Sequence, residues 1–309
     1  MIIGNVRPSS NGSRRHLHAR LRLFARALEG ALRRSAAVCL ASALLSLHIS
    51  CGLAPAARDA ASYGYANAGV LLHGVPLPET GTGFFRAKSG EDTRWAAPVM
   101  RAALERAASF VARTFPGGAP LVIGDISARH GGPHSRHGSH QTGRDVDILF
   151  YLLDAGGRSV RGSGFFAFDE LGASSIHIPA APVSGVAMFD TARNWALVRA
   201  LLLDEQAPTQ WIFCANGIKA RLLMYGALHE SDPRVLVRAA YVLHQPSSGN
   251  PHRDHFHVRL ACTAHERATG CLEAGPVWPW IRLEHEKPER EGRDDDASLV
   301  RALLSDEPP

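Results

Sequence analysis

The sequence predicts an α+β fold, a single domain in which helices flank a central antiparallel sheet. Segments with helical periodicity and segments with strand periodicity follow one another without the regular alternation of a doubly wound parallel sheet. Residues 145–152 (DVDILFYL) and 255–260 (HFHVRL) alternate between polar and apolar side chains, as strands with one core-facing side do. Both segments fit side by side in one antiparallel sheet.

Periodicity and flanking residues place the other elements. Pro-Gly-Gly at 116–118 ends one helical pattern, and Asp232-Pro233 supplies the N-cap and the first residue of another. In chain order, we expect a helix over 95–115, a strand over 121–126, a helix over 191–203 capped by Asp190 or Thr191, a strand over 209–215, a helix after Asn216 and a helix from 232 to about 243.

Composition divides the chain into three parts. Residues 62–283 have ordinary globular composition and suffice for one sizeable domain. Residues 1–57 form a basic leader, in which Arg33-Arg34 precedes the apolar run AAVCLASALLSL (36–47). Residues 284–309 are densely charged, and we expect them to form a solvated, disordered tail.

The leader predicts export. Its apolar run of twelve residues is shorter than the roughly 20 residues of a membrane-spanning helix and fits the core of a secretory signal. A buried helix is the alternative. We therefore expect a periplasmic or otherwise exported protein with no transmembrane span. Lipidation at Cys51 is less favoured, because His48 stands where a lipobox has an aliphatic residue.

The formal net charge of +5 also belongs to the leader, since residues 1–60 hold nine arginines against Glu29 and Asp59. The rest of the chain is slightly acidic. The basic pI is therefore no reason to expect a nucleic-acid partner, which needs a basic face on the folded domain. The sequence leaves the oligomeric state open.

Export affects the interpretation of the cysteines. Cys262 and Cys271 flank a short loop, and we expect them to form a disulfide in an oxidising compartment. A metal-binding pair is the alternative, but the chain has no second cysteine pair to complete such a site. Cys214 lies in the apolar run WIFCA and is expected to be a buried free thiol.

Seven of the sixteen histidines lie in two short windows next to the alternating segments. Imidazole and carboxylate are the ligands of a catalytic zinc ion, which takes three protein ligands and one water. Because the two windows are more than 100 residues apart in the sequence, side chains of this kind in both suggest a site that folding assembles. The windows contain His130, His134, His137 and His140, and then His252, His255 and His257.

Strand alternation puts the polar side chains of each segment on one face. Asp145 and Asp147 share a face in the first segment, and His255, His257 and Arg259 share one in the second. In one sheet, these faces would bring a carboxylate and imidazoles within bonding reach of zinc, about 2.0–2.2 Å. They would line a cleft, whereas the apolar faces would line the core.

The loop before the first segment adds the imidazole of His140, and Gly143 gives the chain a place to turn into the strand. Other hydrolase signatures are missing. The sequence has no HExxH zinc motif, no G-x-S-x-G nucleophile elbow and no phosphate-binding loop. The pattern therefore predicts a metal site made of histidine and aspartate.

The strings SHQTGRDVD (139–147) and HRDHFHVRLAC (252–262) resemble the penicillin-insensitive murein endopeptidases. This family belongs to a superfamily with lysostaphin-type peptidases, D-Ala-D-Ala carboxypeptidases and the hedgehog signalling domain, whose pattern is H-x6-D plus a distant HxH. His140 and Asp147 have this spacing. PLVIGDIS (120–127) and LHGVPLPETGTGF (72–84) extend the resemblance over most of the globular domain.

The resemblance implies zinc ligands, catalytic groups and a supporting carboxylate. The implied ligands of one Zn²⁺ per chain are His140, Asp147 and His257, with His137 as a further metal contact. The other implied roles are action on the water or the transition state for His255, an active-site contact for His252 and support behind the ligands for Asp145, while His130 and His134 receive none.

The implied function is that of a zinc metallopeptidase. It would hydrolyse D-alanyl–diaminopimelyl cross-links between the peptide stems of peptidoglycan through a metal-activated water. Penicillin would not inhibit it, because no serine nucleophile is there to be acylated. The alternatives are a zinc-containing module that binds the cell wall without cutting it, and a D,D-carboxypeptidase or L,D-peptidase of the same fold.

Overall fold

The computed structural model describes residues 61–87, 92–162, 164–176 and 185–281. The expected signal segment (1–57), Cys51 and the charged tail (284–309) lie outside these residues, so the predictions made for them stay predictions. Within the described ranges, no helix combines the length and the apolar character needed to cross a membrane.

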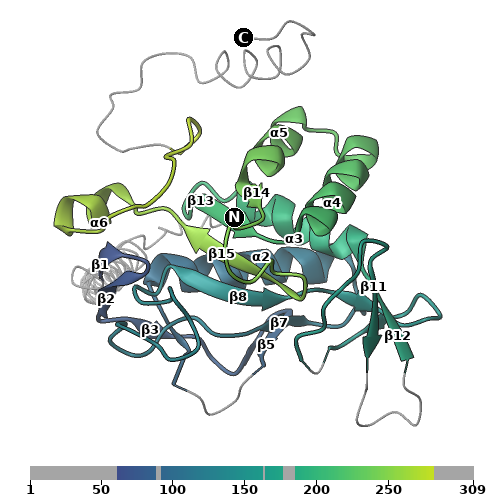
Figure 1. Ribbon diagram of the computed structural model, residues 1–309, viewed down its shortest axis with the longest axis horizontal. Helices are drawn as coiled ribbons and strands as arrows, with labels where there is room; N and C mark the ends of the chain where they lie inside the picture. Colours follow the sequence, from purple (N-terminus) through teal and green to yellow (C-terminus); the bar gives the residue numbers. More distant parts are fainter. Residues whose placement is uncertain (1–60, 88–91, 163, 177–184, 282–309) are drawn as a thin grey trace, which may run out of the picture. The chain divides into compact units, whose positions relative to one another are not determined.

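A seven-stranded sheet runs through the centre of the domain (Figure 1). Its strand order is β14-β13-β15-β8-β7-β5-β4, and the pairings are antiparallel except for β13–β14 and β5–β7. This architecture confirms the α+β class and the central antiparallel sheet. The strands are β4 (Thr80–Gly81), β5 (Phe84–Arg86), β7 (Leu121–Ile123), β8 (Asp145–Leu149), β13 (Thr209–Phe213), β14 (Leu243–His244) and β15 (His255–Leu260).

Four helices lie close to their expected positions, but the first begins at Pro98 instead of Trp95, since Trp95–Ala96 form a short strand, and the helix Ala264–Thr269 was not expected. The Asp190 side chain caps the helix that begins at Thr191 by accepting a hydrogen bond from the backbone N–H of Arg193. Asp232 caps the helix that begins at Pro233 in the same way, and this proline occupies the first helical position. Figure 1 shows α2 and α3 behind the sheet. The helices are α2 (Pro98–Thr114), α3 (Thr191–Leu202), α4 (Asn216–His229), α5 (Pro233–Val242) and α6 (Ala264–Thr269).

The apolar faces of β8 and β15 lie in the main hydrophobic core, as the alternation predicted. Val146 and Ile148 of β8 and Phe256 and Val258 of β15 are fully buried there together with the inner side of α2. Burial of apolar side chains on this scale is the main contribution to folding. The two strands are thus held rigidly from behind, and their other faces are fixed relative to each other.

The polar faces of β8 and β15, which were expected to line a cleft, are also buried. Asp145 is 0% and Asp147 is 2% exposed. The loop before β8 covers this face, since its residues His140 and His137 place ring nitrogens 3.3 and 3.7 Å from the Asp147 carboxylate. Strand alternation cannot reveal a loop that covers a face.

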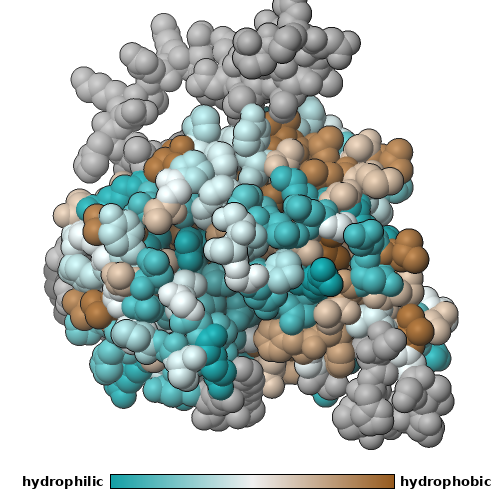
Figure 2. Space-filling model, viewed as in Figure 1, coloured by the Kyte–Doolittle hydropathy of each residue, from teal (hydrophilic) through white to brown (hydrophobic). Residues whose placement is uncertain are grey.

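Smaller sheets and the surface complete the domain. Exposed apolar side chains include Met224 and Leu228 of α4, which are 70% and 79% exposed. On the face drawn in Figure 2, hydrophobic residues gather toward the side of α4, whereas most of the remaining surface is hydrophilic. The further strands are β1 (Ala61–Tyr65) with β2 (Ala68–Leu72), β3 (Val75–Pro76) with β6 (Trp95–Ala96), and β9 (Leu152–Leu153), β10 (Ser159–Val160), β11 (Ala173–Ile176) and β12 (Gly185–Phe189) in one sheet.

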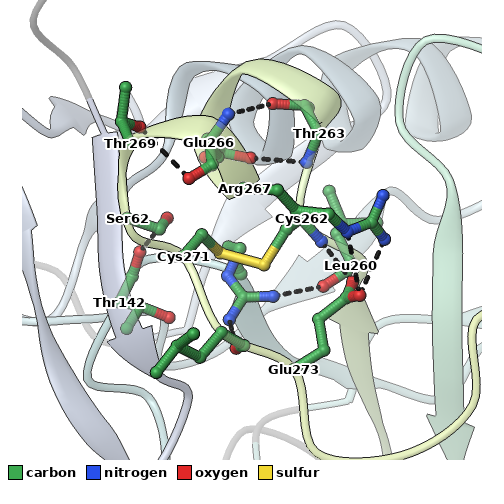
Figure 3. Close-up of a disulfide and its surroundings, with 12 residues drawn as sticks. Ser62, Thr142, Leu260, Cys262, Thr263, Glu266, Arg267, Thr269, Cys271 and Glu273 are labelled. Carbon is green, nitrogen blue, oxygen red and sulfur yellow. Dashed lines mark hydrogen bonds and ion pairs between the residues drawn. A yellow bond between two sulfur atoms is a disulfide. The ribbon is translucent and has the colours of Figure 1, made fainter. Parts of the chain in front are cut away.

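The cysteines behave as predicted. Cys262 and Cys271 form a disulfide, and the segment between them is the short helix α6 (Figure 3). The buried guanidinium of Arg144 donates to backbone carbonyls just before and just after this bridge, which ties the end of β15 to the following segment. Cys214 is a buried free thiol, and burial raises its pKa to about 12.

Candidate metal centre

The two strands with polar faces are direct antiparallel neighbours. His257 of β15 lies opposite Asp147 of β8, and Arg259 lies opposite Asp145. Side chains that face each other across an antiparallel pair are close enough to interact. The register therefore brings the expected ligands from two distant windows to one point of the sheet.

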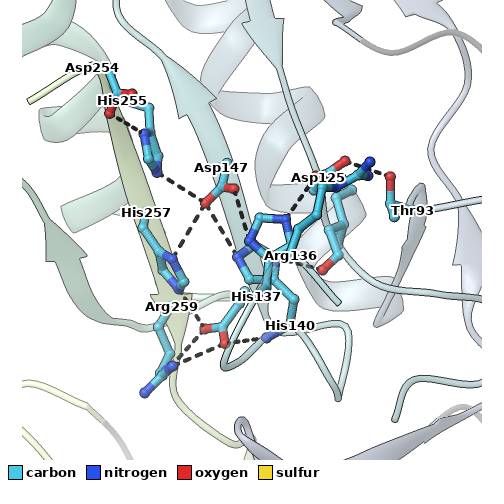
Figure 4. Close-up of polar contacts among 12 residues, drawn as sticks. Thr93, Asp125, Arg136, His137, His140, Asp147, Asp254, His255, His257 and Arg259 are labelled. Carbon is cyan, nitrogen blue, oxygen red and sulfur yellow. Dashed lines mark hydrogen bonds and ion pairs between the residues drawn. The ribbon is translucent and has the colours of Figure 1, made fainter. Parts of the chain in front are cut away.

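The Asp147 carboxylate is the hub of this cluster (Figure 4). Its Oδ1 atom lies 3.3 Å from His140 Nε2, 3.4 Å from His255 Nε2 and 3.4 Å from His257 Nδ1. The other oxygen, Oδ2, lies 3.7 Å from Nδ1 of His137. Burial raises the pKa of Asp147, but the neighbouring His140 and the other imidazoles outweigh it and hold this pKa well below its usual range.

His140 is aimed at Asp147 by the loop before β8. Its Nδ1 donates to the carbonyl of Ile126 at 2.7 Å, so that Nε2 points to the carboxylate. Its backbone has a φ of 66°, a left-handed conformation that is uncommon outside glycine. Gly143, with a φ of 71°, makes the turn into β8, as predicted, and a Cβ there would lie 2.6 Å from the backbone nitrogen of Ala97.

A buried carboxylate orients His137. Oδ2 of Asp125 lies 2.8 Å from Nε2 of this imidazole, and the hydroxyl of Thr93 donates to Oδ1 at 2.6 Å. The Arg136 guanidinium lies 3.3 Å from the same Oδ2 atom. With Nε2 held by Asp125, Nδ1 of His137 faces Asp147. A carboxylate commonly fixes the orientation of a metal-binding imidazole in this way.

A second buried carboxylate lies behind His257. Oδ1 of Asp145 is 3.5 Å from His257 Nε2, so this carboxylate faces the ring nitrogen that is turned away from Asp147. Arg259 grips Asp145 with two hydrogen bonds of 2.7 and 3.0 Å. Burial raises the pKa of Asp145, but the charge of Arg259 outweighs it and keeps this pKa well below its usual range.

His255 lies between two carboxylates. Its Nδ1 is 2.7 Å from Oδ1 of Asp254, and its Nε2 faces Asp147. Burial lowers the pKa of His255, but the carboxylates of Asp147 and Asp254 outweigh it and raise the pKa to about 9. The ring of Phe165 packs edge-on against the imidazole at 5.1 Å. The imidazole is therefore held firmly, with one nitrogen directed at the hub.

The remaining histidines of the two windows lie farther from the hub. The His252 ring is 4.9 Å from that of His255 and 5.5 Å from that of His257, and its backbone is left-handed, with a φ of 54°. Burial and these neighbours lower the pKa of His252 to about 4. His134 stacks on the ring of His137 at 5.3 Å, and His130 accepts a backbone hydrogen bond from β2.

The chemistry of the cluster fits a bound zinc ion. Among the described residues, His140 Nε2 and Asp147 Oδ1 are buried without a hydrogen-bond partner, although they face each other. Two ligands about 2.0–2.1 Å from a tetrahedral ion are about 3.3–3.4 Å apart. That is the separation of Asp147 Oδ1 from His140 and from His257. An ion bonded to these atoms would satisfy groups that are otherwise costly to bury.

The position of His137 is closer to the centre than the sequence suggested. Within the described part of the chain, His137, His140 and Asp147 are the three side chains whose ligand atoms all lie within 4.8 Å of one another. His257 joins them through its 3.4 Å approach to Asp147. His137, expected as a further metal contact, thus belongs to the innermost group.

Asp145 was expected from the sequence as a supporting carboxylate, but two other carboxylates that orient imidazoles were not. Asp125 follows the apolar strand β7, and Asp254 directly precedes His255. A polar residue at the end of a buried strand was the available signal for Asp125. Its partner His137, however, is twelve positions away across a loop without periodicity. The sequence therefore pointed to the clustered histidines, Asp145 and Asp147, and not to Asp125 and Asp254.

A comparison with known families assigns the chain to one of them. The family model described as penicillin-insensitive murein endopeptidase matches residues 62–279. No curated protein matches the chain at a significant level. The matched range covers most of the chain and includes the clustered histidines and carboxylates of β8 and β15. The chain belongs to the penicillin-insensitive murein endopeptidase family.

Proposed function

We propose that this protein is a zinc-dependent D,D-endopeptidase that hydrolyses the D-alanyl–diaminopimelyl cross-links of peptidoglycan. The family supports a hydrolase that acts on murein. The observation that carries the zinc dependence is the position of Asp147 Oδ1, which lies 3.3–3.4 Å from three imidazole nitrogens. The substrate groups are the cross-linked peptide stems.

His140, Asp147 and His257 are the proposed ligands of one zinc ion per chain, with His137 as a further one. When bound, zinc supplies a Lewis acid for the scissile carbonyl and lowers the pKa of a coordinated water towards about 7. Asp145 keeps His257 oriented from behind, through its 3.5 Å approach to Nε2. This support sets which nitrogen of the imidazole is available to the metal.

His255 is the proposed catalytic histidine. Its Nδ1 is fixed by Asp254, so Nε2 is the atom that can take a proton from the attacking water or stabilise the developing oxyanion. His252, which packs against the rings of His255 and His257, is a proposed second active-site histidine on the side of the substrate. His255 belongs to β15, and His252 lies in the segment just before it, where its carbonyl accepts a hydrogen bond from the N–H of Ala215.

Export belongs to the same proposal. The substrate lies outside the cytoplasm, and the Cys262–Cys271 disulfide is a feature of oxidising compartments. The signal segment at 1–57 and the domain bounds of 62–283 are consistent with it. Lipidation at Cys51 remains the less favoured alternative.

Purified full-length protein and muropeptide dimers test this function. We expect mass spectrometry to detect monomers with zinc present, none after chelation, and monomers again after zinc is restored. His265→Ala, which changes an exposed histidine on α6, should cleave as the wild type does. Cleavage that survives a strong chelator, or release of single D-alanine instead of monomers, would contradict the proposal.

A further inference from the structure

Aromatic side chains continue the metal-facing surface of the sheet beyond His257. In the pairing of β13 with β15, Phe213 lies opposite His257 and Trp211 lies opposite Arg259. The ring of Phe213 is 5.4 Å from that of His257, and Trp211 stacks with Phe213 at 5.8 Å. One face of three adjacent strands thus passes from carboxylate to imidazole to aromatic ring.

Three more rings extend this surface away from the metal centre. Trp278 lies 5.2 Å from Trp211, and Trp280 stacks on Trp278 at 5.5 Å. Tyr241 of α5 lies 5.6 and 6.1 Å from these two tryptophans. We call Trp211, Phe213, Tyr241, Trp278 and Trp280 the aromatic platform. Figure 1 shows the segment after α6 rising toward α5, which carries Tyr241.

The platform is fixed but not buried. The indole N–H of Trp278 donates to the carbonyl of Gln210 at 2.7 Å, which fixes the ring against β13. Tyr241 is 38% exposed, and the tryptophans and Phe213 are half-buried. Large aromatic side chains contribute strongly to binding where one face stays accessible. A contiguous group of five beside a polar site is more than the single exposed apolar residues that any surface carries.

Two guanidinium groups and an imidazole lie along the platform. The guanidinium of Arg259 is 5.6 Å from the ring of Phe213, and that of Arg238 is 5.6 Å from the ring of Trp280. His244, which is exposed, lies 5.0 Å from Trp211. The surface therefore combines flat apolar rings with guanidinium groups over two of them and an imidazole beside a third. This combination suits a ligand with apolar faces and a polar rim.

We propose that the aromatic platform binds the sugar rings of the peptidoglycan glycan strand, so that the attached peptide stem reaches the metal centre. The inference rests on the proposed function. A pyranose ring presents C–H groups on its faces and hydroxyl and acetamido groups at its rim. The peptide stems carry methyl groups and carboxylates but no large apolar side chains, so the sugars are the part of the substrate that matches stacked indoles. Phe213, the first ring of the platform, packs against the ring of His257, so the platform is continuous with the metal centre.

Two substrates separate a sugar contact from a peptide contact. One is a cross-linked dimer that carries its disaccharides, and the other is the same dimer with the sugars removed. For full-length Trp280→Ala, we expect kcat/KM to fall about tenfold on the first substrate, as truncation of an aromatic anchor typically does, and much less on the second. Trp280→Phe should restore most of the loss, and Tyr65→Ala, an exposed tyrosine of β1, should behave as wild type on both. Equal losses on the two substrates would overturn the inference.

Calorimetry with an N-acetylglucosamine tetramer tests binding without turnover. We expect the wild type to bind it and Trp280→Ala and Tyr241→Ala to bind it at least several-fold more weakly, with unchanged circular dichroism. If the tetramer binds and neither dimer is cleaved, the platform stands and the proposed function fails. If both dimers are cleaved and the tetramer does not bind, the function stands and the inference fails. Self-association that depends on Trp280, without tetramer binding, would also overturn it, because the surface would then join two copies.

Discussion

His257 lies opposite Asp147 in the pairing of β15 with β8, and its Nδ1 is 3.4 Å from Oδ1 of the carboxylate. The opposite nitrogen of the same ring faces Asp145 at 3.5 Å. One imidazole is thus held between two buried carboxylates, one in the proposed metal site and one behind it. The arrangement is set by strand register, because a shift by one residue would turn these side chains to the other face.

Removal of the carboxylate behind His137 should weaken metal binding. In Asp125→Asn, Nε2 of His137 keeps a polar neighbour but loses the charge that fixes its orientation, and we expect zinc affinity to fall about 10–100-fold. Competition with a chromogenic chelator measures the affinity. Glu205→Gln removes an exposed carboxylate and should bind zinc as the wild type does. An affinity unchanged by Asp125→Asn would show that His137 is not a ligand.

The ion pair between Arg259 and Asp145 should contribute to stability. Arg259→Met leaves a fully buried carboxylate without its bidentate partner, and we expect the free energy of unfolding to fall by roughly 3–5 kcal/mol. Urea denaturation of the metal-free protein measures it. The double variant Arg259→Met/Asp145→Asn removes the unpaired charge and should recover part of the loss. A single variant as stable as the wild type would contradict the arrangement.

His255 should titrate unusually high in the metal-free protein. Burial opposes protonation, but Asp147 and Asp254 raise the pKa to about 9. Because this is above the unfolded value of about 6.5, the resulting stabilisation is full below pH of about 6.5 and is lost as pH rises through about 9. NMR titration of the ring under a chelator measures the pKa. Asp254→Asn should lower it, and an unaltered midpoint in that variant would refute the assigned cause.

Gly143 makes the turn into β8, and Gly157, in the turn between β9 and β10, is a matched control for it. Both have a positive φ, of 71° and 74°, but a Cβ at 143 would meet the Ala97 backbone at 2.6 Å, whereas Gly157 faces open space. Gly157→Ala should cost about 1 kcal/mol of unfolding free energy through the backbone alone. Gly143→Ala should cost clearly more and also weaken zinc binding, because the loop that aims His140 must shift. Equal costs in thermal unfolding would contradict this account.

Much of the fold and the centre of the site could be predicted from local patterns. Alternation in β8 and β15 identified Asp147 and His257 as residues of one polar face, and the Asp232-Pro233 pair marked the start of α5. These signals are local, because strand period and helix caps depend on neighbours in the sequence. The loop before β8 added His140 as a further imidazole, and its spacing from Asp147 matched the pattern of the family resemblance.

The rest depends on contacts between distant segments. Burial of the polar face comes from the loop before β8, and the grip of Asp125 on His137 crosses that same loop. Strands of two residues, such as β9, are too short for a periodic signal. The aromatic platform joins β13, α5 and the segment after α6, so that no single stretch of sequence reveals it. Tertiary packing alone brings these groups together.

The most direct test of the central claim compares two variants of the hub in one measurement of zinc content and muropeptide cleavage. For Asp147→Asn, we expect loss of stoichiometric zinc and of monomer formation together, because this carboxylate is the shared neighbour of the imidazoles. For His255→Gln, we expect zinc to be retained while turnover falls by at least about a hundredfold, the scale of general acid–base catalysis. An Asp147→Asn protein that binds zinc stoichiometrically and still cuts cross-links would contradict the account.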